Sequence, residues 1–136
     1  MALVWNDNME LGIPTIDAQH KKLVELCGEA FDLSKEIEDG KDYYDDITMI
    51  LTEIKKYTVE HFEYEESLMK EAGYANLLDH EMEHTFFVKK IEKLNKKEYD
   101  EPQEQKEFIL NLSQVLFDWL SHHILETDKK YVETLK

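Results

Sequence analysis

The stretch LLDHEMEHTFFVKKIEKL, residues 77–94, indicates how this chain folds. Its apolar residues and histidines recur at alternating steps of three and four, which places them on one face of an α-helix. That face reads Leu77, His80, His84, Phe87, Ile91 and Leu94. Histidine stands at two positions where a buried helix face usually carries leucine. We therefore predict a helix over about residues 76–96 whose buried face includes imidazoles.

Three further segments repeat the same helical periodicity. They cover about residues 17–38, 43–71 and 103–133. Four amphipathic helices joined by short loops pack most simply as an antiparallel up-down-up-down bundle. The sequence therefore predicts an all-α fold, with one domain over residues 1–136 and an N-terminal arm over residues 1–15.

Single residues suggest where the first two helices begin and end. Asp17 or Thr15, just after Pro14, is the expected cap of the first helix. Gly40 is expected to close that helix, and Gly73 to end the second in a left-handed conformation.

Composition excludes several classes of protein. The chain has 136 residues and a net charge of −15, and all 16 of its cationic residues are lysine. An acidic chain without arginine is a poor binder of nucleic acid or anionic membranes. No apolar run is long enough to span a membrane, and the N-terminus lacks a secretory signal, so we expect a cytoplasmic protein. The single cysteine, Cys27, is expected to be buried and inert.

Five of the six histidines occupy core-facing positions, and each predicted helix supplies at least one. These five are His20, His61, His80, His84 and His123. Each buried imidazole needs a hydrogen-bond partner, and an unsatisfied group costs about 1–3 kcal/mol. Convergence on a metal would satisfy all five together. The sixth, His122, is expected on the helix surface.

Two carboxylates accompany these histidines. Glu65 follows His61 by four residues, so both can reach one centre, and a buried carboxylate needs a cation beside it. Asp128 follows His123 by five residues, about 140° around a regular helix. Either the two reach different sides of a wide site, or the helix is locally irregular there.

The ligand types indicate the metal. Five imidazoles exceed the ligand count of one tetrahedral ion, which suggests two metal ions. Imidazole combined with carboxylate favours iron over Mg²⁺ or Ca²⁺, whereas Zn²⁺ and Mn²⁺ stay possible on ligand type alone.

Two other metal proteins share parts of this pattern. HEMEH, residues 80–84, matches the H-E-x-x-H motif of zinc proteases, but the downstream ligands and the substrate-binding strand of that class are absent from the sequence. Glu81 is accordingly expected to be a solvated residue. A ferritin-like di-iron oxidase would need two E-x-x-H motifs and two further glutamates, and only Glu81–His84 fits well.

Taken in order, His20, HFEYE at 61–65, HEMEH at 80–84 and HILETD at 123–128 resemble the hemerythrin family in its bacterial single-domain form. The resemblance covers almost the whole chain. It implies two non-haem iron ions with an oxo or hydroxo bridge. Three histidines would hold one iron and two the other: His80, His84 and His123 for the first, His20 and His61 for the second. Glu65 and Asp128 would bridge both.

The resemblance also implies a function. The second iron would keep one open position, at which O₂ binds reversibly, so we expect a protein for oxygen storage, transport or delivery rather than an enzyme. Four residues match the apolar O₂ pocket of the family: Phe62, Trp119, Leu120 and Ile124. Tyr74 and Tyr131 match family tyrosines near the site. The alternatives are a domain that senses O₂ or redox state, or a di-iron enzyme that handles peroxide or nitric oxide.

Overall fold

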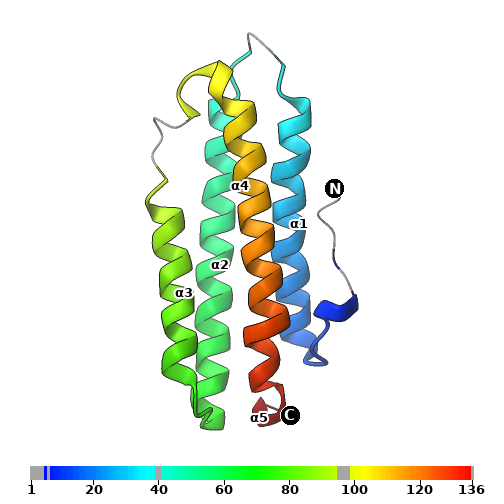
Figure 1. The fold of residues 1–136 in the computed structure, drawn as a ribbon, viewed down its shortest axis with the longest axis vertical. Helices are drawn as coiled ribbons and strands as arrows, with labels where there is room; N and C mark the ends of the chain where they lie inside the picture. Colours follow the sequence, from blue (N-terminus) through cyan, green and yellow to red (C-terminus); the bar gives the residue numbers. More distant parts are fainter. Residues whose placement is uncertain (1–4, 6, 39–40, 95–98, 136) are drawn as a thin grey trace.

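The computed structural model of the protein describes residues 5, 7–38, 41–94 and 99–135. Four long helices run alternately up and down: α1 Pro14–Glu36, α2 Tyr44–Ala72, α3 Leu77–Glu92 and α4 Pro102–His122 (Figure 1). The described residues contain no β-strand. The predicted all-α, up-down-up-down bundle is therefore confirmed.

Several predicted boundaries fall beyond the described residues. They are the first part of the arm at 1–4 and 6, the helix closure at Gly40, the helix end at 96, and the last residue, 136. Within the described arm, Asp7–Met9 forms a 3₁₀ turn, and Trp5 is half-buried against the core.

The first helix is capped differently from the prediction. It begins at Pro14, with Ile13 as the extended residue before it. Neither Thr15 nor Asp17 is the cap. Instead, the backbone N–H groups of Leu11 and Gly12 donate to the Asp17 carboxylate at 2.8 and 3.0 Å. The acidic side chain in the first turn therefore fixes the chain that enters the helix, rather than its first free N–H groups.

Gly73 ends α2 as predicted. Its φ is +71°, the left-handed conformation that a residue without Cβ adopts at little cost. The N–H of Gly73 donates to the Lys70 carbonyl, and the N–H of Tyr74 donates to the Met69 carbonyl. This turn reverses the chain into α3 and places the first turns of α3 beside the last turns of α2.

The fourth helix is not regular to its end. After α4, residues His123–Thr127 form a π-helical turn and Asp128–Tyr131 a 3₁₀ turn, before the short α5 at Val132–Leu135. The single continuous helix predicted over 103–133 is therefore wrong at this point. The interruption lies between the two metal-ligand candidates of this segment.

The core divides into an apolar part and a polar part. In α2, Ile47 and Ile54 are buried towards the N-terminal end, and His61 and Glu65 are buried further along. Met69 is also fully buried. The polar part lies towards the end of the bundle where α2 joins α3.

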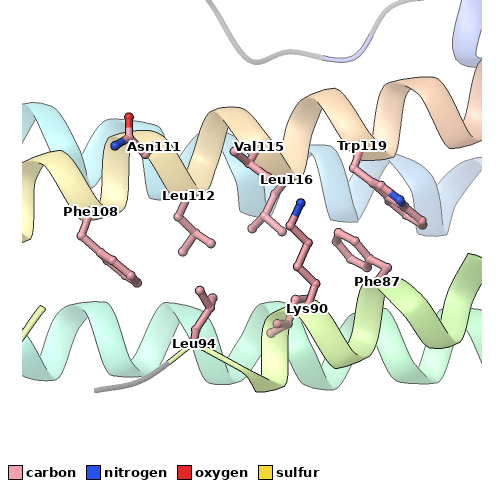
Figure 2. A pocket seen from close by; sticks show the side chains of 10 residues that line it. Phe87, Lys90, Leu94, Phe108, Asn111, Leu112, Val115, Leu116 and Trp119 are labelled. Carbon is pink, nitrogen blue, oxygen red and sulfur yellow. The ribbon is translucent and has the colours of Figure 1, made fainter. Parts of the chain in front are cut away.

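A groove separates α3 from α4 away from this polar part. It has a volume of about 310 Å³, and side chains of both helices line it, including Phe87, Leu94, Phe108 and Leu116 (Figure 2).

Among the helices of the described residues, none is both long and apolar enough to cross a membrane.

Candidate metal centre

All seven predicted ligand residues meet in one buried cluster. Each has 2% or less of its surface exposed, and their side-chain donor atoms form two overlapping groups. The members come from α1, α2 and α3 and from the irregular turns after α4: His20, His61, Glu65, His80, His84, His123 and Asp128. Helical steps of three and four put the side chains of α1, α2 and α3 on inner faces, and the packing of the bundle brings them together with His123 and Asp128.

The Glu65 carboxylate lies between two sets of imidazoles. Its Oε2 is 3.3 Å from the Nε2 atoms of both His20 and His61. Its Oε1 is 3.1 Å from Nε2 of His84 and 3.5 Å from Nε2 of His80. One oxygen therefore faces the two-histidine set and the other faces the three-histidine set.

Asp128, in the 3₁₀ turn after α4, repeats this arrangement. Its Oδ2 lies 3.1 Å from Nε2 of His20. Its Oδ1 lies 2.9 Å from Nε2 of His80 and 3.1 Å from Nε2 of His123. Both carboxylates thus direct one oxygen to each histidine set.

The donor atoms of the cluster are arranged for binding metal ions and do not satisfy one another through hydrogen bonds. Several buried atoms form no hydrogen bond, among them Glu65 Oε1, His80 Nε2 and both oxygens of Asp128. Leaving such atoms unsatisfied costs about 1–3 kcal/mol each. Ligands at right angles around a cation, with bonds of about 2.1 Å, lie about 3.0 Å apart. The spacing within the cluster matches this value, and a cation in each set would satisfy the unpaired atoms.

The electrostatics of the cluster are those of a cation site. Burial would lower the pKa of His20, but the nearby carboxylates of Asp128 and Glu65 outweigh this and raise its pKa to about 9. The same balance raises the pKa of His80 to about 9. Burial opposes the ionisation of Asp128 and Glu65, yet the imidazoles around them hold both carboxyl pKa values below their usual range. Ionised carboxylates here require positive charge beside them, from protons or from metal.

The π-helical turn explains how Asp128 reaches the cluster. The Asp128 N–H donates to the carbonyl of His123, five residues earlier, and this wider turn replaces the regular four-residue step. The side chains of His123 and Asp128 can then face the same centre, which a regular helix forbids. Of the two possibilities that the sequence left open, the local irregularity is the one that occurs.

The outer nitrogens of two histidines are held by neighbouring side chains. Nδ1 of His61 hydrogen-bonds with Oε1 of Gln19 at 2.5 Å, and Nδ1 of His84 with Oε2 of Glu66 at 2.7 Å. Such partners set the ring orientation and the tautomer of a ligating histidine. Sequence analysis missed both, because nothing but their position beside His20 and Glu65 distinguishes them from other polar residues.

Tyr131 supports the carboxylate in the centre of the cluster. Its ring is fully buried, and its hydroxyl donates to Glu65 Oε2 at 2.7 Å. Burial and the nearby carboxylates raise the pKa of this phenol well above its usual value, so it stays a donor. The hydroxyl therefore lies inside the protein and not at its surface. Tyr74 is half-buried, with its ring edge-on to His80 and Tyr131.

The four predicted pocket residues all lie against the cluster or the core beside it. The Phe62 ring stacks on the imidazole of His84 at 3.8 Å between centroids, and the Trp119 ring stacks on His123 at 4.5 Å. Leu120 and Ile124 are buried. Leu120 and Phe62 share the lining of a small internal cavity. These side chains enclose the cluster with apolar surface.

Other polar candidates lie outside the cluster. His122 is exposed and Glu81 is only half-buried, and neither belongs to a group of donor atoms that could hold a metal. In HEMEH, therefore, His80 and His84 are the potential ligands and Glu81 is not. Cys27 is buried, as predicted, and burial raises the pKa of its thiol to about 12, which disfavours the reactive thiolate.

Known proteins are similar to this chain in sequence and in fold. Residues 11–135 match the family model described as "Hemerythrin HHE cation binding domain". The chain is 39% identical to the bacteriohemerythrin of Clostridium acetobutylicum over 130 residues, which cover 96% of this chain and 98% of that one. It is 28% identical to the myohemerythrin of Riftia pachyptila over 130 residues, covering 94% and 89% of the two chains.

A crystal structure of a hemerythrin mutant superimposes with a TM-score of 0.81 at 25% identity, covering 99% of this chain and 98% of that chain. The sequence match, the bundle and the cluster of potential cation ligands agree. The chain therefore belongs to the hemerythrin family.

Proposed function

We propose that the protein binds O₂ reversibly at a non-haem di-iron site formed by the seven clustered residues. The observation that carries this proposal is the arrangement of the two carboxylates. Glu65 and Asp128 each direct one oxygen to the three-histidine set and the other to the two-histidine set. Two such carboxylates and five imidazoles would hold a metal pair, and this donor set suits iron.

The two sets differ in the number of donor atoms that they supply. Three imidazoles and two carboxylate oxygens would hold one metal ion, and two imidazoles and two carboxylate oxygens would hold the other. The ion held by His20 and His61 would therefore have one ligand fewer from the protein, and a molecule as small as O₂ suits a buried site. Two ferrous ions would supply the two electrons that O₂ takes up on binding and recover them on its release.

The residues of this chain have three tasks in that function. The imidazoles and carboxylates hold the metal pair. Tyr131 and Glu66 fix the orientation of Glu65 and His84 through their hydrogen bonds. Phe62, Trp119, Leu120 and Ile124 keep water away, which strengthens electrostatic interactions inside and limits proton transfer from solvent. No residue is needed as a catalytic base, so binding rather than turnover is the proposed activity.

Metal analysis together with a visible spectrum tests the metal. We expect about two iron ions per chain and charge-transfer bands in the aerobic protein. A colourless protein with stoichiometric zinc would contradict the proposal. Stopped-flow mixing of the reduced protein with O₂ then tests the activity. A carrier forms a stable oxygenated species that releases O₂ under vacuum, whereas immediate oxidation with turnover of peroxide would indicate an enzyme.

A pair of histidine variants tests the ligand assignment. His61→Ala removes one of the two imidazoles at the position proposed for O₂, so we expect it to lose that iron and retain the other. His122→Ala is the matched control, because His122 is exposed and outside the cluster. Equal iron content in His61→Ala and the unmodified protein would show that the assignment is wrong.

A further inference from the structure

The outer face of α3 carries an unusual concentration of exposed apolar side chains. Five large apolar side chains of the described residues are exposed: Met49, Leu78, Met82, Phe86 and Val115. Three of them follow one another along α3 in steps of four residues. Leu78 is 70% exposed, Met82 63% and Phe86 66%. On a helix this spacing makes one continuous stripe, here called the outer stripe.

The outer stripe is not part of the core. The inner face of α3 is formed by His80, His84, Phe87 and Ile91, which are all buried. α3 packs chiefly on α2, and a groove separates it from α4 (Figures 1 and 2). The outer stripe therefore points away from both neighbours. A contiguous apolar patch on an otherwise highly charged protein indicates a contact surface.

The charges beside the outer stripe change sign along the helix. Asp79, Glu81 and Glu83 lie in the N-terminal half of α3, and Lys89, Lys90 and Lys93 lie at its C-terminal end. Within the described residues, neither Asp79 nor Lys89 has an ion-pair partner. An antiparallel copy of the same helix would place acidic half against basic half, whereas a parallel copy would align like charges.

We propose that the outer stripe is a self-association surface, which pairs antiparallel with the outer stripe of a second copy of this chain. In the register that sets Met82 opposite Phe86 of the second copy, Asp79 lies opposite Lys89 of the second copy. A two-fold axis makes each of these contacts twice. Apolar contact then supplies the attraction, and the charge pattern selects the antiparallel orientation.

The size of the stripe sets the strength of the contact. Standard protein–protein interfaces bury roughly 800 Å² per partner, and three side chains on one helix bury much less. The dimer is therefore weak and forms at high protein concentration. The stripe faces away from His80 and His84, so this inference does not rest on the proposed O₂ binding.

Sedimentation velocity over a series of protein concentrations tests the proposal. We expect the sedimentation coefficient to rise from that of a monomer towards that of a dimer. Met82→Lys should raise the dissociation constant at least about tenfold, which corresponds to about 1.4 kcal/mol. Met49→Lys is the matched control, because Met49 is 65% exposed but lies alone on α2. A coefficient independent of concentration, or equal disruption by both variants, would overturn the proposal.

Exchanging charges tests the orientation. Asp79→Lys and Lys89→Asp should each weaken the dimer, and the double variant should restore it, because each contact again joins opposite charges. Circular dichroism and urea unfolding verify that all variants are folded. Failure of the double variant to restore association would overturn the antiparallel register. A different outcome would also overturn the proposal. If the unmodified protein stayed monomeric but sedimented with phosphatidylcholine–phosphatidylglycerol vesicles, and Met82→Lys abolished this binding, the stripe would be a lipid-binding surface and not a dimer contact.

Discussion

The two faces of α3 invert the usual distribution of polar and apolar residues. Its inner face carries His80 and His84, whose imidazoles are buried, while its outer face carries Leu78, Met82 and Phe86 in contact with solvent. Both departures are unfavourable for an isolated chain, since buried polar groups need partners and exposed apolar groups attract one another. In each case a binding partner removes the conflict. We infer a metal pair for the inner face and a second copy for the outer face.

Among variants that compare the two faces, the largest effect is expected on metal content, when a potential ligand is removed from the inner face. His84→Ala should lose the metal ion of the three-histidine set, because its Nε2 atom lies 3.1 Å from Glu65 Oε1 and 3.0 Å from Nε2 of His123. Thr85→Ala alters the adjacent, exposed residue and should retain the full metal content. Metal analysis after dialysis measures both. Equal loss from the two variants would mean that α3 responds to any substitution, whichever face it alters.

The second largest effect is the loss of stability that distinguishes two adjacent phenylalanines, one on each face of α3. Phe87 is buried and stacks on Trp119 at 3.9 Å between centroids, whereas Phe86 is exposed. Phe87→Ala should lower the free energy of unfolding by about 3–5 kcal/mol, because it leaves a cavity. Phe86→Ala should change it by no more than about 0.5 kcal/mol. Urea unfolding of the dilute protein measures both, and similar losses would refute the assignment of the outer face.

The smallest effect concerns the residue that orients His84. Glu66→Gln removes the charge from the hydrogen bond to Nδ1 of His84, and we expect metal affinity to fall about 10–100-fold. Glu63→Gln is the control, because Glu63 lines a surface groove between α2 and α3 together with Glu66 but makes no hydrogen bond to a histidine among the described residues. Competition with a coloured chelator measures the affinities. An unchanged affinity in Glu66→Gln would limit its role to packing.

Much of the fold and of the site could be predicted because both depend on local periodicity. Steps of three and four identify the inner faces of all four helices, and they place His20, His61, Glu65, His80 and His84 on those faces without any knowledge of packing. Five imidazoles on apolar faces already indicate metal, since few other arrangements satisfy so many buried nitrogens. Recognition of the family then assigned each ligand to one of two irons, and that assignment stays a prediction.

The remaining features depend on contacts between residues far apart in the chain or on deviations from regular geometry. A regular helix would turn Asp128 away from His123, and only the π-helical turn brings both to one centre. The hydrogen bond from Tyr131 to Glu65 and the hydrogen bond between His84 and Glu66 follow from packing between elements.

The sequence by itself thus determined four amphipathic helices, an acidic surface and a set of metal-binding side chains on the inner faces, because these follow from residue type and helical period. It also contains Leu78, Met82 and Phe86 in steps of four, but periodicity alone does not show that this stripe has no partner. The tertiary structure decided that point, since the packing of α3 on α2 and the groove beside α4 leave the stripe in solvent. It likewise decided that each carboxylate faces both histidine sets, because this requires atoms of α1, α2, α3 and the turns after α4 to lie within about 3 Å of one another.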